Sequence, residues 1–419
     1  MTKKFWQLSP AERRVLLVDQ GILTQAQADF WSTQTTLPET VLLGLSENNI
    51  GQMSLPVGVV PNVQIAGKAV TIPLATEEPS VVAAISHGFK MMSQGRTIQV
   101  VKNIHGVTGQ IGLQHVSASD LTILQDHQAD LQRIGLAAHP TLTSHGGAIR
   151  QIQIKRVGQS DAAIIVTVDS GNAMGANIMN DILEAMARTV TQLTNAEVLF
   201  AVLTNDGRDS LTQLTVTVAF DQLTTKTWSG EQVAQRIQAL ADWAQTDPRR
   251  AVTHNKGIMN GVEAIVLATG NDTRAVNAAA HAYAAVSGQY CGLSHWHVET
   301  DGLHGEMTLP LPVGTVGGAT KVLPSAQQAL ALLHQPSAVQ LQAIAASVGL
   351  AANLAALHAL VTDGIQRGHM RLQYDSLAVR VGATAAEIAP LAAALAAADK
   401  PSETLAQQLL SQLRHKGEN

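Results

Sequence analysis

The sequence predicts an α+β protein built from more than one packed unit. At 419 residues the chain is long for a single hydrophobic core, and its content of 46% apolar and 14% charged residues is typical of well-packed globular proteins. Alternating apolar patterns surround one long amphipathic pattern between about Gln110 and Asp206, whereas residues from about 230 to 365 carry mainly helical patterns. The first region predicts a small α+β unit and the second a larger helical one.

The first hundred residues predict a capped helix and a β-hairpin. In "LSPAERRVLLVDQG", Ser9 suits the N-cap and Pro10 the first helical position. In "VQIAGKAVTIPLA", two alternating runs surround Gly67, as in two strands joined by a tight turn.

The middle of the chain predicts four strands and one long helix. The strands are expected at "QIQIKRV", "AAIIVTVDS", "EVLFAVLTND" and "LTVTVAF", and the helix over "ANIMNDILEAMARTVTQLT". Before the helix, residues 171–175 form a turn of small residues that could hold a phosphate on backbone N–H groups, although an ordinary strand-to-helix turn explains it better. No two glycines are two positions apart, which excludes G-x-G-x-x-G and argues against a standard Rossmann domain.

The later part of the chain predicts three helices, at "GEQVAQRIQALADWAQ", "NDTRAVNAAAHAYAAVSG" and "SAVQLQAIAASVGLAANLAALHALVTDG". The stretch between the first two is expected to be an irregular loop around Lys256, followed by a buried strand at Ala264–Leu267. Beyond Gly364 and Gly368, Ala-rich segments predict a helical C-terminal piece that moves separately.

Composition and charge narrow the classes of function. The formal net charge of −5, without a run of Lys or Arg, argues against nucleic acid and anionic lipid as partners. The single cysteine, Cys291, cannot form an internal disulfide, and the charged N-terminus does not resemble a signal peptide. The longest apolar run considered, "IAPLAAALAAA", is too short to span a bilayer. We therefore expect a soluble cytoplasmic protein.

Four features could carry chemistry, and each also has an ordinary structural explanation. Glu77 and Glu78 before Pro79 could simply favour a helix N-terminus, or one could donate a proton from a cleft. Lys256 could be a solvated loop lysine, although its apolar, Gly-rich surroundings weaken that explanation. Asp272 suits a helix N-cap. His369, in "GIQRGHM", could be the partner of a helix dipole.

Two further groups favour the structural explanation. The segment "SHWHVETDGLHGE" offers three histidines and three carboxylates, but it lacks zinc-type spacing and is expected to be a polar, solvated loop that binds no metal. Cys291 could be an acyl-transfer nucleophile, but a lone cysteine without an assigned base is more often a small buried residue.

Taken together and in order, the motifs of this chain resemble class II 3-hydroxy-3-methylglutaryl-coenzyme A (HMG-CoA) reductases over nearly its whole length. Six blocks carry the resemblance: "ENNIGQMSLPVGV" (47–59), "ATEEPSVVAA" (75–84), "NAMGANIMND" (172–181), "THNKGIMNGVEAIVLATGNDTRAV" (253–276), "LPLPVGTVGGATK" (309–321) and "GIQRGHM" (364–370).

The resemblance implies the site residues. The family's catalytic glutamate, lysine, aspartate and histidine fall on Glu78, Lys256, Asp272 and His369. Its substrate contacts fall on Ser80, Arg250, Asn260 and Asn205, and its cofactor contacts on Gln151, Asn172, Met174, Gly175 and Asn177. We expect Lys256 to stabilise the negative charge that hydride transfer places on the carbonyl oxygen in a dry site. Asp272 is expected to orient this lysine and keep it charged.

The resemblance also implies the architecture. A large, mainly helical domain for the CoA ester is expected over 1–105 and 206–365, with a small ferredoxin-like, non-Rossmann domain for the nicotinamide cofactor inserted at 106–205. A helical C-terminal flap is expected over 366–419. Family members assemble as homodimers with active sites at the subunit interface.

The expected reaction is the reduction of HMG-CoA to mevalonate and CoA by two NAD(P)H, for isoprenoid biosynthesis. Gln151 stands where NADH-using relatives carry an aspartate, and Arg150, Lys155 and Arg156 are close in sequence, which favours NADPH over NADH. Three alternatives stay open: the reverse oxidation of mevalonate with NAD, a non-catalytic protein that binds CoA thioesters, and acyl transfer through Cys291.

Overall fold

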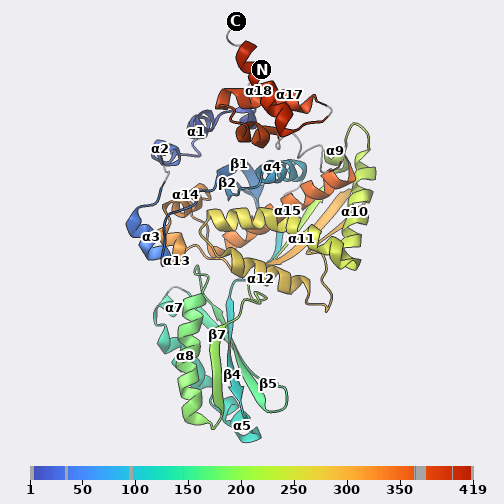
Figure 1. Cartoon of the computed structure of the whole chain (residues 1–419). Coiled ribbons are helices and arrows are strands. Elements are labelled where there is room, and N and C mark those ends of the chain that lie inside the picture. The colour runs from blue at the N-terminus through green and yellow to red at the C-terminus, as the bar shows by residue number, and fades with distance from the viewer. Residues whose placement is uncertain are drawn as a thin grey trace.

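The computed structural model describes residues 4–33, 36–93, 98–144, 146–362, 364, 374–398 and 400–416. They form a central body, a sheet-and-helix unit at one end and a helical C-terminal piece at the other (Figure 1). The predicted mixture of helices and strands is confirmed.

The unit at the lower end of Figure 1 is a four-stranded antiparallel sheet covered by helices. Its elements are β4 (Val107–Gln114), α5 (Ala118–Asp126), α6 (Gln128–Ala138), α7 (Thr141–Ser144), β5 (Ala148–Val157), β6 (Asp161–Asp169), α8 (Ala176–Leu193) and β7 (Glu197–Leu203). The strand order β5-β6-β4-β7 with a βαββαβ sequence of elements is that of a ferredoxin-like unit. One apolar side of α8, including Met179, Ile182 and Met186, is buried in the core of this unit.

One predicted strand belongs to a different sheet. The segment "LTVTVAF" follows the small unit in the strand pattern, although the expected domain bounds place it in the large domain. Its first five residues lie in β8 (Leu211–Val218), which pairs with β3 (Gln99–Asn103) and β10 (Gly302–Pro310) in the central body. The small sheet takes β4 instead. The sequence hides β4 because Gly109 and Gly112 interrupt its apolar pattern. Both glycines leave room for larger neighbours, since an added Cβ would lie 2.5 Å from Leu183 at one and 2.3 Å from Phe200 at the other.

The predicted histidine-rich loop is a β-hairpin. Strand β9 (Ser294–Glu299) pairs with β10 across a short turn, at the edge of the sheet β3-β8-β10-β9. Inward-facing Trp296, Leu303 and Met307 are buried and anchor the hairpin, whereas its histidines and carboxylates face outward. The alternation of apolar and polar residues was a strand pattern that the abundance of histidine obscured.

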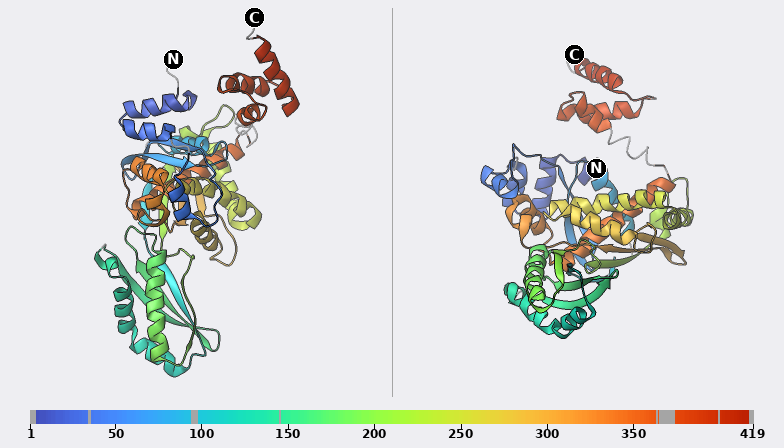
Figure 2. Two further views of the ribbon diagram at one scale, coloured as in Figure 1. Left: turned by 60° about the vertical axis from the view of Figure 1, so that its left-hand side comes forward. Right: turned by 60° about the horizontal axis from the view of Figure 1, so that its bottom comes forward.

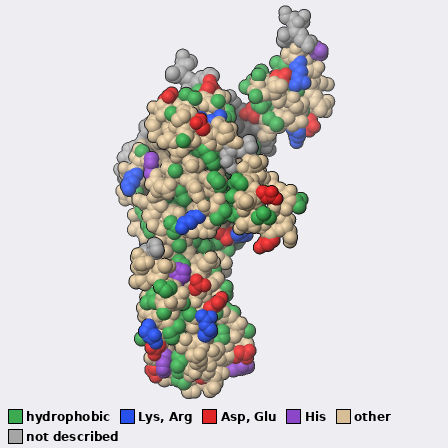
Figure 3. Space-filling model, turned by 90° about the vertical axis from the view of Figure 1, so that its left-hand side faces the viewer, with side chains coloured by type: hydrophobic (Ala, Val, Ile, Leu, Met, Phe, Trp, Pro, Cys, Tyr) green, Lys and Arg blue, Asp and Glu red, His purple; other side chains and the backbone are tan. Residues whose placement is uncertain are grey.

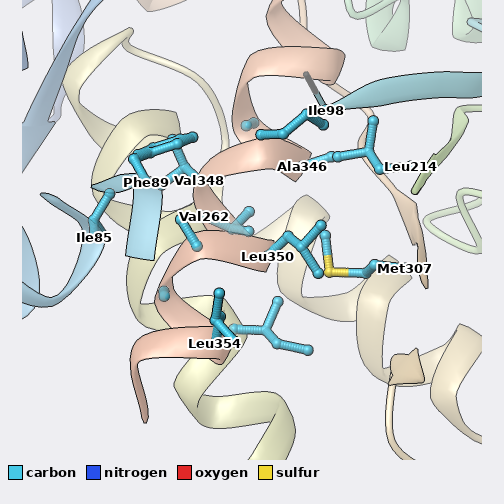
Figure 4. Close-up of a cluster of buried hydrophobic side chains, with 14 of the residues drawn as sticks. Ile85, Phe89, Ile98, Leu214, Val262, Met307, Ala346, Val348, Leu350 and Leu354 are labelled. Atoms are coloured by element: carbon cyan, nitrogen blue, oxygen red, sulfur yellow. The ribbon is translucent and has the colours of Figure 1, made fainter. Parts of the chain in front are cut away.

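The central body is built around α15 (Ala338–Val361), which is buried nearly all round. Figure 4 shows Val348, Leu350 and Leu354 of this helix among side chains from neighbouring elements. Helices α4 (Val81–Met92), α10 (Gly230–Thr246) and α11 (Pro248–Ala268) pack against it. Contact with α4 is so close that a Cβ on Gly88 would lie 2.0 Å from the carbonyl oxygen of Ala351.

The composition of α15 corrects one expectation. Among the described helices it alone is long and apolar enough, by length and composition, to cross a bilayer, whereas the sequence was expected to contain no such segment. Its residues are nevertheless mostly buried inside the protein, so the central position of the helix accounts for its apolar character.

The stretch around Lys256 is a helix, which corrects the predicted loop and strand. Asp247 caps α11 by accepting a hydrogen bond from the backbone of Arg249, and Pro248 occupies the first turn. Buried Asn255 finds polar partners in the backbone of Cys291 and Leu293, each at 2.9 Å. The apolar run at 264–267 resembled a strand because α11 packs against both α15 and strand β2 (Lys68–Ala75), so that apolar residues occupy most sides of the helix.

The helix cap and the turn predicted in the first hundred residues are present in the structure. Ser9 caps α1, and β1 and β2 form the expected hairpin around Gly67. The other helices of this part of the chain are η1 (Phe5–Gln7), α1 (Pro10–Asp19), α2 (Gln25–Thr33), α3 (Glu39–Leu45), α9 (Phe220–Leu223), α12 (Thr273–Ala284), α13 (Gly318–Val322) and α14 (Pro324–Leu332), and the hairpin strands are β1 (Val57–Ile65) and β2 (Lys68–Ala75).

The C-terminal piece has a small core of its own. Residues 374–380, α17 (Ala385–Ala396) and α18 (Glu403–Lys416) enclose an apolar cluster that includes Leu391 and Leu395. Both views of Figure 2 show these helices set off from the central body. The described part of the C-terminal piece is therefore helical and has a core of its own, whereas its expected bounds and separate motion stay predictions.

Candidate active site

Glu78 and Lys256 meet although 178 positions separate them in the sequence. Glu78 lies in the turn between β2 and α4, where its backbone N–H bonds to Thr76 Oγ1 at 3.2 Å. Lys256 lies on α11, which packs against both β2 and α4. Lys256 Nζ is 3.1 Å from Glu78 Oε2. The fold therefore brings a cation and a carboxylate together on well-packed elements.

The turn that carries Glu78 has an unusual backbone. Ser80, at the N-cap of α4, has a φ of 75°, in the left-handed region that residues other than glycine rarely adopt. Its hydroxyl donates to the carbonyl oxygen of Pro79 and does not cap α4. Strain of this kind is concentrated at functional sites, because the surrounding structure must hold it in place.

Asp272 lies at the N-cap of α12, where its carboxylate contacts groups other than the expected partner, Lys256. Its carboxylate accepts hydrogen bonds from the backbone of Arg274 and Ala275 at 2.9 and 3.2 Å, and pairs with the Arg274 side chain at 3.0 Å. The Lys256 side chain is 61% exposed. In the single chain the helix cap and Arg274 occupy the Asp272 carboxylate, and no element among the described residues encloses Lys256. The expectation of a dry ammonium held by Asp272 therefore stays a prediction.

The other expected substrate contacts are distributed over α11 and one loop. Asn260 lies one helical turn after Lys256 and hence on the same side of α11. Arg250 lies on the first turn, and its Nε is buried without a hydrogen-bond partner among the described residues. Burial lowers the pKa of Arg250. Asn205 is exposed in the loop after β7, and His369 lies outside the described residues.

A buried polar network holds α11 from behind, and the sequence analysis missed it. His254 Nε2 lies 2.7 Å from Ser294 Oγ and 3.2 Å from Asn353 Nδ2, and Asn353 Oδ1 accepts from Trp296 Nε1 at 2.8 Å. Burial, reinforced by the positive charges of Arg250 and His295, lowers the pKa of His254 to about 3. Neutral His254 thus anchors the side of α11 that is turned away from solvent.

The turn before α8 is braced against the central body. The carbonyl oxygen of Ala173 contacts His105 Nε2 at 3.0 Å and accepts from Ser170 Oγ at 2.7 Å. Gly175 caps α8 with a φ of 98°, where only glycine is unstrained. Asn172 Oδ1 accepts from the Ala338 backbone at 3.0 Å, so its side chain is directed to α15.

A loop at 311–316 joins this turn to the corner that carries Asp272. Asn271 Oδ1 accepts from the Gly314 backbone at 2.7 Å, and the Thr315 backbone donates to Asn172 O at 2.8 Å. A Cβ on Gly314 would lie 2.4 Å from the backbone nitrogen of Met174. Three of the six sequence blocks therefore meet here. In the sequence, the only sign of this close approach was the glycines within these blocks.

The residues expected to determine cofactor preference lie at different points along β5. A register shift between Ile149 and Gln151 leaves Arg150 unpaired in the ladder, and both Arg150 and Gln151 are exposed. Arg150 Nη2 lies 2.6 Å from Asp169 Oδ2, and the other oxygen of Asp169 accepts from the Gly171 backbone at 3.0 Å. Arg150 therefore lies beside the turn, whereas Lys155 is five residues further along the strand. Met174 is half-buried in the turn and Asn177 is exposed on the first turn of α8.

A wide cleft borders the glutamate turn. Its volume is about 2740 Å³, and its walls include Glu77, Glu78, Ser80, parts of the N-terminal helices and Ala392 of α17. Pockets for small molecules usually enclose roughly 300–1,000 Å³. The cleft is therefore larger than a pocket for one small ligand.

Among the described residues, Cys291 contacts no candidate base. Its thiol contacts the carbonyl oxygens of Gln245 and Gln289 at 3.5 and 3.4 Å and the hydroxyl of Ser287 at 3.9 Å. Backbone carbonyls and a hydroxyl do not activate a thiol for nucleophilic attack.

Comparison with known proteins decides the family. The sequence model of hydroxymethylglutaryl-coenzyme A reductase matches residues 9–374. The chain belongs to the HMG-CoA reductase family. A protein called 3-hydroxy-3-methylglutaryl-coenzyme A reductase from Archaeoglobus fulgidus is 35% identical, over 98% of this chain and 94% of that protein. A probable HMG-CoA reductase from Borreliella burgdorferi is 32% identical, over 90% of this chain and 86% of that protein.

Solved structures support the same assignment. The class II HMG-CoA reductase of Streptococcus pneumoniae, bound to NADPH in open conformations, is 39% identical with a TM-score of 0.81, and the match covers 97% of this chain and 100% of that one. The resemblance to class II HMG-CoA reductases found in the motifs is therefore confirmed, and the chain is an oxidoreductase of this family.

Proposed function

We propose that this chain reduces HMG-CoA to mevalonate and CoA, using two molecules of reduced nicotinamide cofactor, as a biosynthetic step of the mevalonate pathway. The observation that carries the proposal is the pairing of Lys256 with Glu78, in a chain of the HMG-CoA reductase family. Reducing a thioester to an alcohol places negative charge on a carbonyl oxygen twice. A fixed ammonium stabilises that charge, and a neighbouring carboxyl can supply the proton that neutralises it.

Each residue then has one task. Lys256 binds the carbonyl oxygen and Glu78 protonates it when the intermediate aldehyde becomes the alcohol. His369 protonates the departing CoA thiolate. Asp272 orients Lys256, which requires its carboxylate to leave the contact with Arg274. Substrate is held by Ser80, Asn260, Asn205 and Arg250. The buried Nε of Arg250, which has no hydrogen-bond partner in the described part of the chain, supports that last contact.

The small sheet unit is proposed to bind the cofactor, which supplies the hydride. Backbone N–H groups at the N-terminus of the 18-residue helix α8 suit a pyrophosphate, and Gly175 lets the chain approach closely. Gln151, Asn172, Met174, Gly175 and Asn177 surround this helix end, although Asn172 would contribute through its backbone. Arg150 beside the turn supports a preference for NADPH, since its guanidinium suits a 2′-phosphate.

The proposed domains follow this division of labour. Residues 1–105 and 206–365 would form the CoA-ester domain, 106–205 the inserted cofactor domain and 366–419 a flap that carries His369 to the site. The separate sheets and the separate C-terminal core support these boundaries.

We further propose a cytoplasmic homodimer with active sites at the subunit interface. An exposed lysine is a poor oxyanion group in water, so a second chain is needed to exclude solvent from Lys256. Exposed Leu43, Ile50 and Met53, in and after α3, and the wide cleft offer apolar surface for that chain. On the face shown in Figure 3, basic side chains are scattered among acidic ones, which does not suit nucleic acid.

The direct test is spectrophotometric. Purified protein should oxidise NADPH only when HMG-CoA is present, consume two NADPH per HMG-CoA and release CoA thiol in equal amount to substrate. Light scattering should give twice the chain mass. Binding of HMG-CoA without oxidation would indicate a non-catalytic CoA-ester protein, and a strong preference for NADH would favour the degradative direction.

A further inference from the structure

The outward face of the β9–β10 hairpin concentrates imidazoles and carboxylates. Strand pairing sets His304 of β10 directly opposite His297 of β9, and the two rings stack with centroids 5.4 Å apart. Glu299 follows His297 by two positions and therefore points to the same face. Asp301 lies in the turn that joins the strands. The register of the hairpin thus brings these four side chains to one place.

Their ligand atoms converge. Glu299 Oε1 lies 3.0 Å from His297 Nε2, and its other oxygen lies 3.6 Å from His304 Nε2. Asp301 Oδ1 lies 2.6 Å from His304 Nε2. One ligand atom each from His297, Glu299 and His304 can be chosen so that all lie within 4.8 Å of one another.

A third strand fixes the orientation of one imidazole. Thr217 of β8 lies in register with His304, and its hydroxyl is 3.4 Å from His304 Nδ1. A bond to Nδ1 directs Nε2 toward the carboxylates, which is how a second residue orients a metal-binding histidine. His304 is also the most enclosed member of the group, with 22% of its side chain exposed.

We propose that His297, His304, Glu299 and Asp301 form a binding site for a divalent transition metal of the zinc class. Two imidazoles with carboxylates match zinc, whereas Mg²⁺ and Ca²⁺ prefer oxygen ligands alone. Tetrahedral zinc needs ligand atoms roughly 3.3 Å apart. His297, Glu299 and His304 supply three convergent donors, and Asp301, which contacts His304 Nε2, would supply the fourth after its side chain rotates. The metal would clamp the tip of a hairpin whose strand β9 lies at the edge of its sheet.

The site is independent of the proposed reaction. Its ligands share neither an element nor a contact with Glu78 or Lys256 among the described residues. The test of zinc binding therefore does not depend on whether this protein reduces HMG-CoA, and the two proposals can fail separately.

The test uses the full chain, freed of metal by chelation and dialysis. Calorimetric titration with ZnCl₂ should show one tight site per chain, and Co²⁺ should give the visible absorption of a tetrahedral complex with nitrogen and oxygen ligands. His297→Gln and His304→Gln should each weaken zinc binding at least about tenfold. Glu299→Gln should weaken it too, and it preserves size and hydrogen-bonding capacity if the histidine variants fold poorly.

The matched control is His295→Gln. His295 lies on the same face of the same hairpin, opposite Glu306, but outside the convergent group. It should bind zinc as the unmodified protein does. The proposal is overturned if the unmodified protein has no micromolar zinc site, or if the Glu299 variant and both histidine variants bind zinc as tightly as the control.

Discussion

Lys256 Nζ lies 3.1 Å from Glu78 Oε2, across the junction of α11 with the turn before α4. Because the two side chains are 61% and 38% exposed, this pair contributes at most about 1 kcal/mol to folding. Its importance is positional: two groups that can stabilise and neutralise an oxyanion are held at hydrogen-bonding distance by elements that pack against the buried helix α15.

Replacing the ammonium should abolish most activity. We expect Lys256→Met to lower kcat for HMG-CoA-dependent NADPH oxidation by about 10²–10³ or more, as loss of an oxyanion donor does elsewhere. The unfolding midpoint should change little because the side chain is largely exposed. Lys68→Met, at the tip of the β1–β2 hairpin, is the control and should keep full activity. A Lys256→Met enzyme with near-normal kcat would contradict the proposed role.

The close approach of Gly314 to the turn before α8 predicts an effect on cofactor binding. In Gly314→Ala the new Cβ would lie 2.4 Å from Met174 N, a backbone atom that can move only with its turn. We expect the KM for NADPH to rise about tenfold or more, on the scale of one lost charge-assisted contact of roughly 1.5 kcal/mol. The control is Gly158→Ala, just after the end of β5, where an added Cβ has no neighbour within 4 Å. Its left-handed φ of 64° makes that substitution cost some stability, but the KM for NADPH should not change.

Cofactor preference should depend on Arg150 rather than on Lys155. Arg150 lies beside the turn before α8, whereas Lys155 lies some 16 Å further along an extended strand, at roughly 3.3 Å per residue. Arg150→Ala should raise the KM for NADPH about tenfold and leave the KM for NADH nearly unchanged. Steady-state kinetics of Arg150→Ala and of Lys155→Ala with both cofactors will distinguish the two residues. Equal losses for NADPH and NADH in Arg150→Ala would count against a contact with the 2′-phosphate.

Buried His254 should make the protein sensitive to acid. Its pKa in the folded state is lowered to about 3, whereas the unfolded chain titrates near 6.5, so protons bind preferentially to the unfolded state below that value. Between pH 7 and pH 5 this single group should remove about 2 kcal/mol of stability. Urea unfolding at both pH values should show that His254→Gln, although less stable at pH 7, loses about 2 kcal/mol less than the unmodified protein on acidification.

Cys291 should be dispensable for the reaction. Its thiol contacts two backbone carbonyls and a hydroxyl, none of which can act as a general base. Cys291→Ala should therefore keep kcat within about twofold of the unmodified value, since it removes no group that stabilises charge. Loss of activity without loss of folding, followed by circular dichroism, would revive the acyl-transfer alternative.

Several elements of the fold could be predicted from local capping and turn residues. Ser9 with Pro10 predicted a helix start, and the runs around Gly67 predicted a hairpin, because caps and turns depend on neighbours in sequence. The prediction of a loop at Lys256 was wrong because the helix there is stabilised by residues that are distant in sequence. Only tertiary contacts tell that a helix rich in Gly and Asn is stabilised by burial against α15.

The candidate site was predictable as a set of residues but not as a geometry. The motifs placed Glu78 and Lys256 in one site, and the structure brings them together. The same motifs could not tell that Arg274 would occupy Asp272, since competition between two cations for one carboxylate depends on their relative positions. Nor could they reveal the network of His254, whose members come from three separate elements.

The hydrogen bonds that join Asn271, Gly314, Thr315 and Asn172 make three distant stretches of sequence structurally co-dependent. Anyone grafting the dinucleotide specificity of a relative onto this chain would have to transplant 311–316 along with 171–177. Exchanging either stretch alone would break the hydrogen bonds between them. The hydride-donating carbon of the cofactor and the accepting carbon of the substrate would then be misaligned, even if every chemical group were retained.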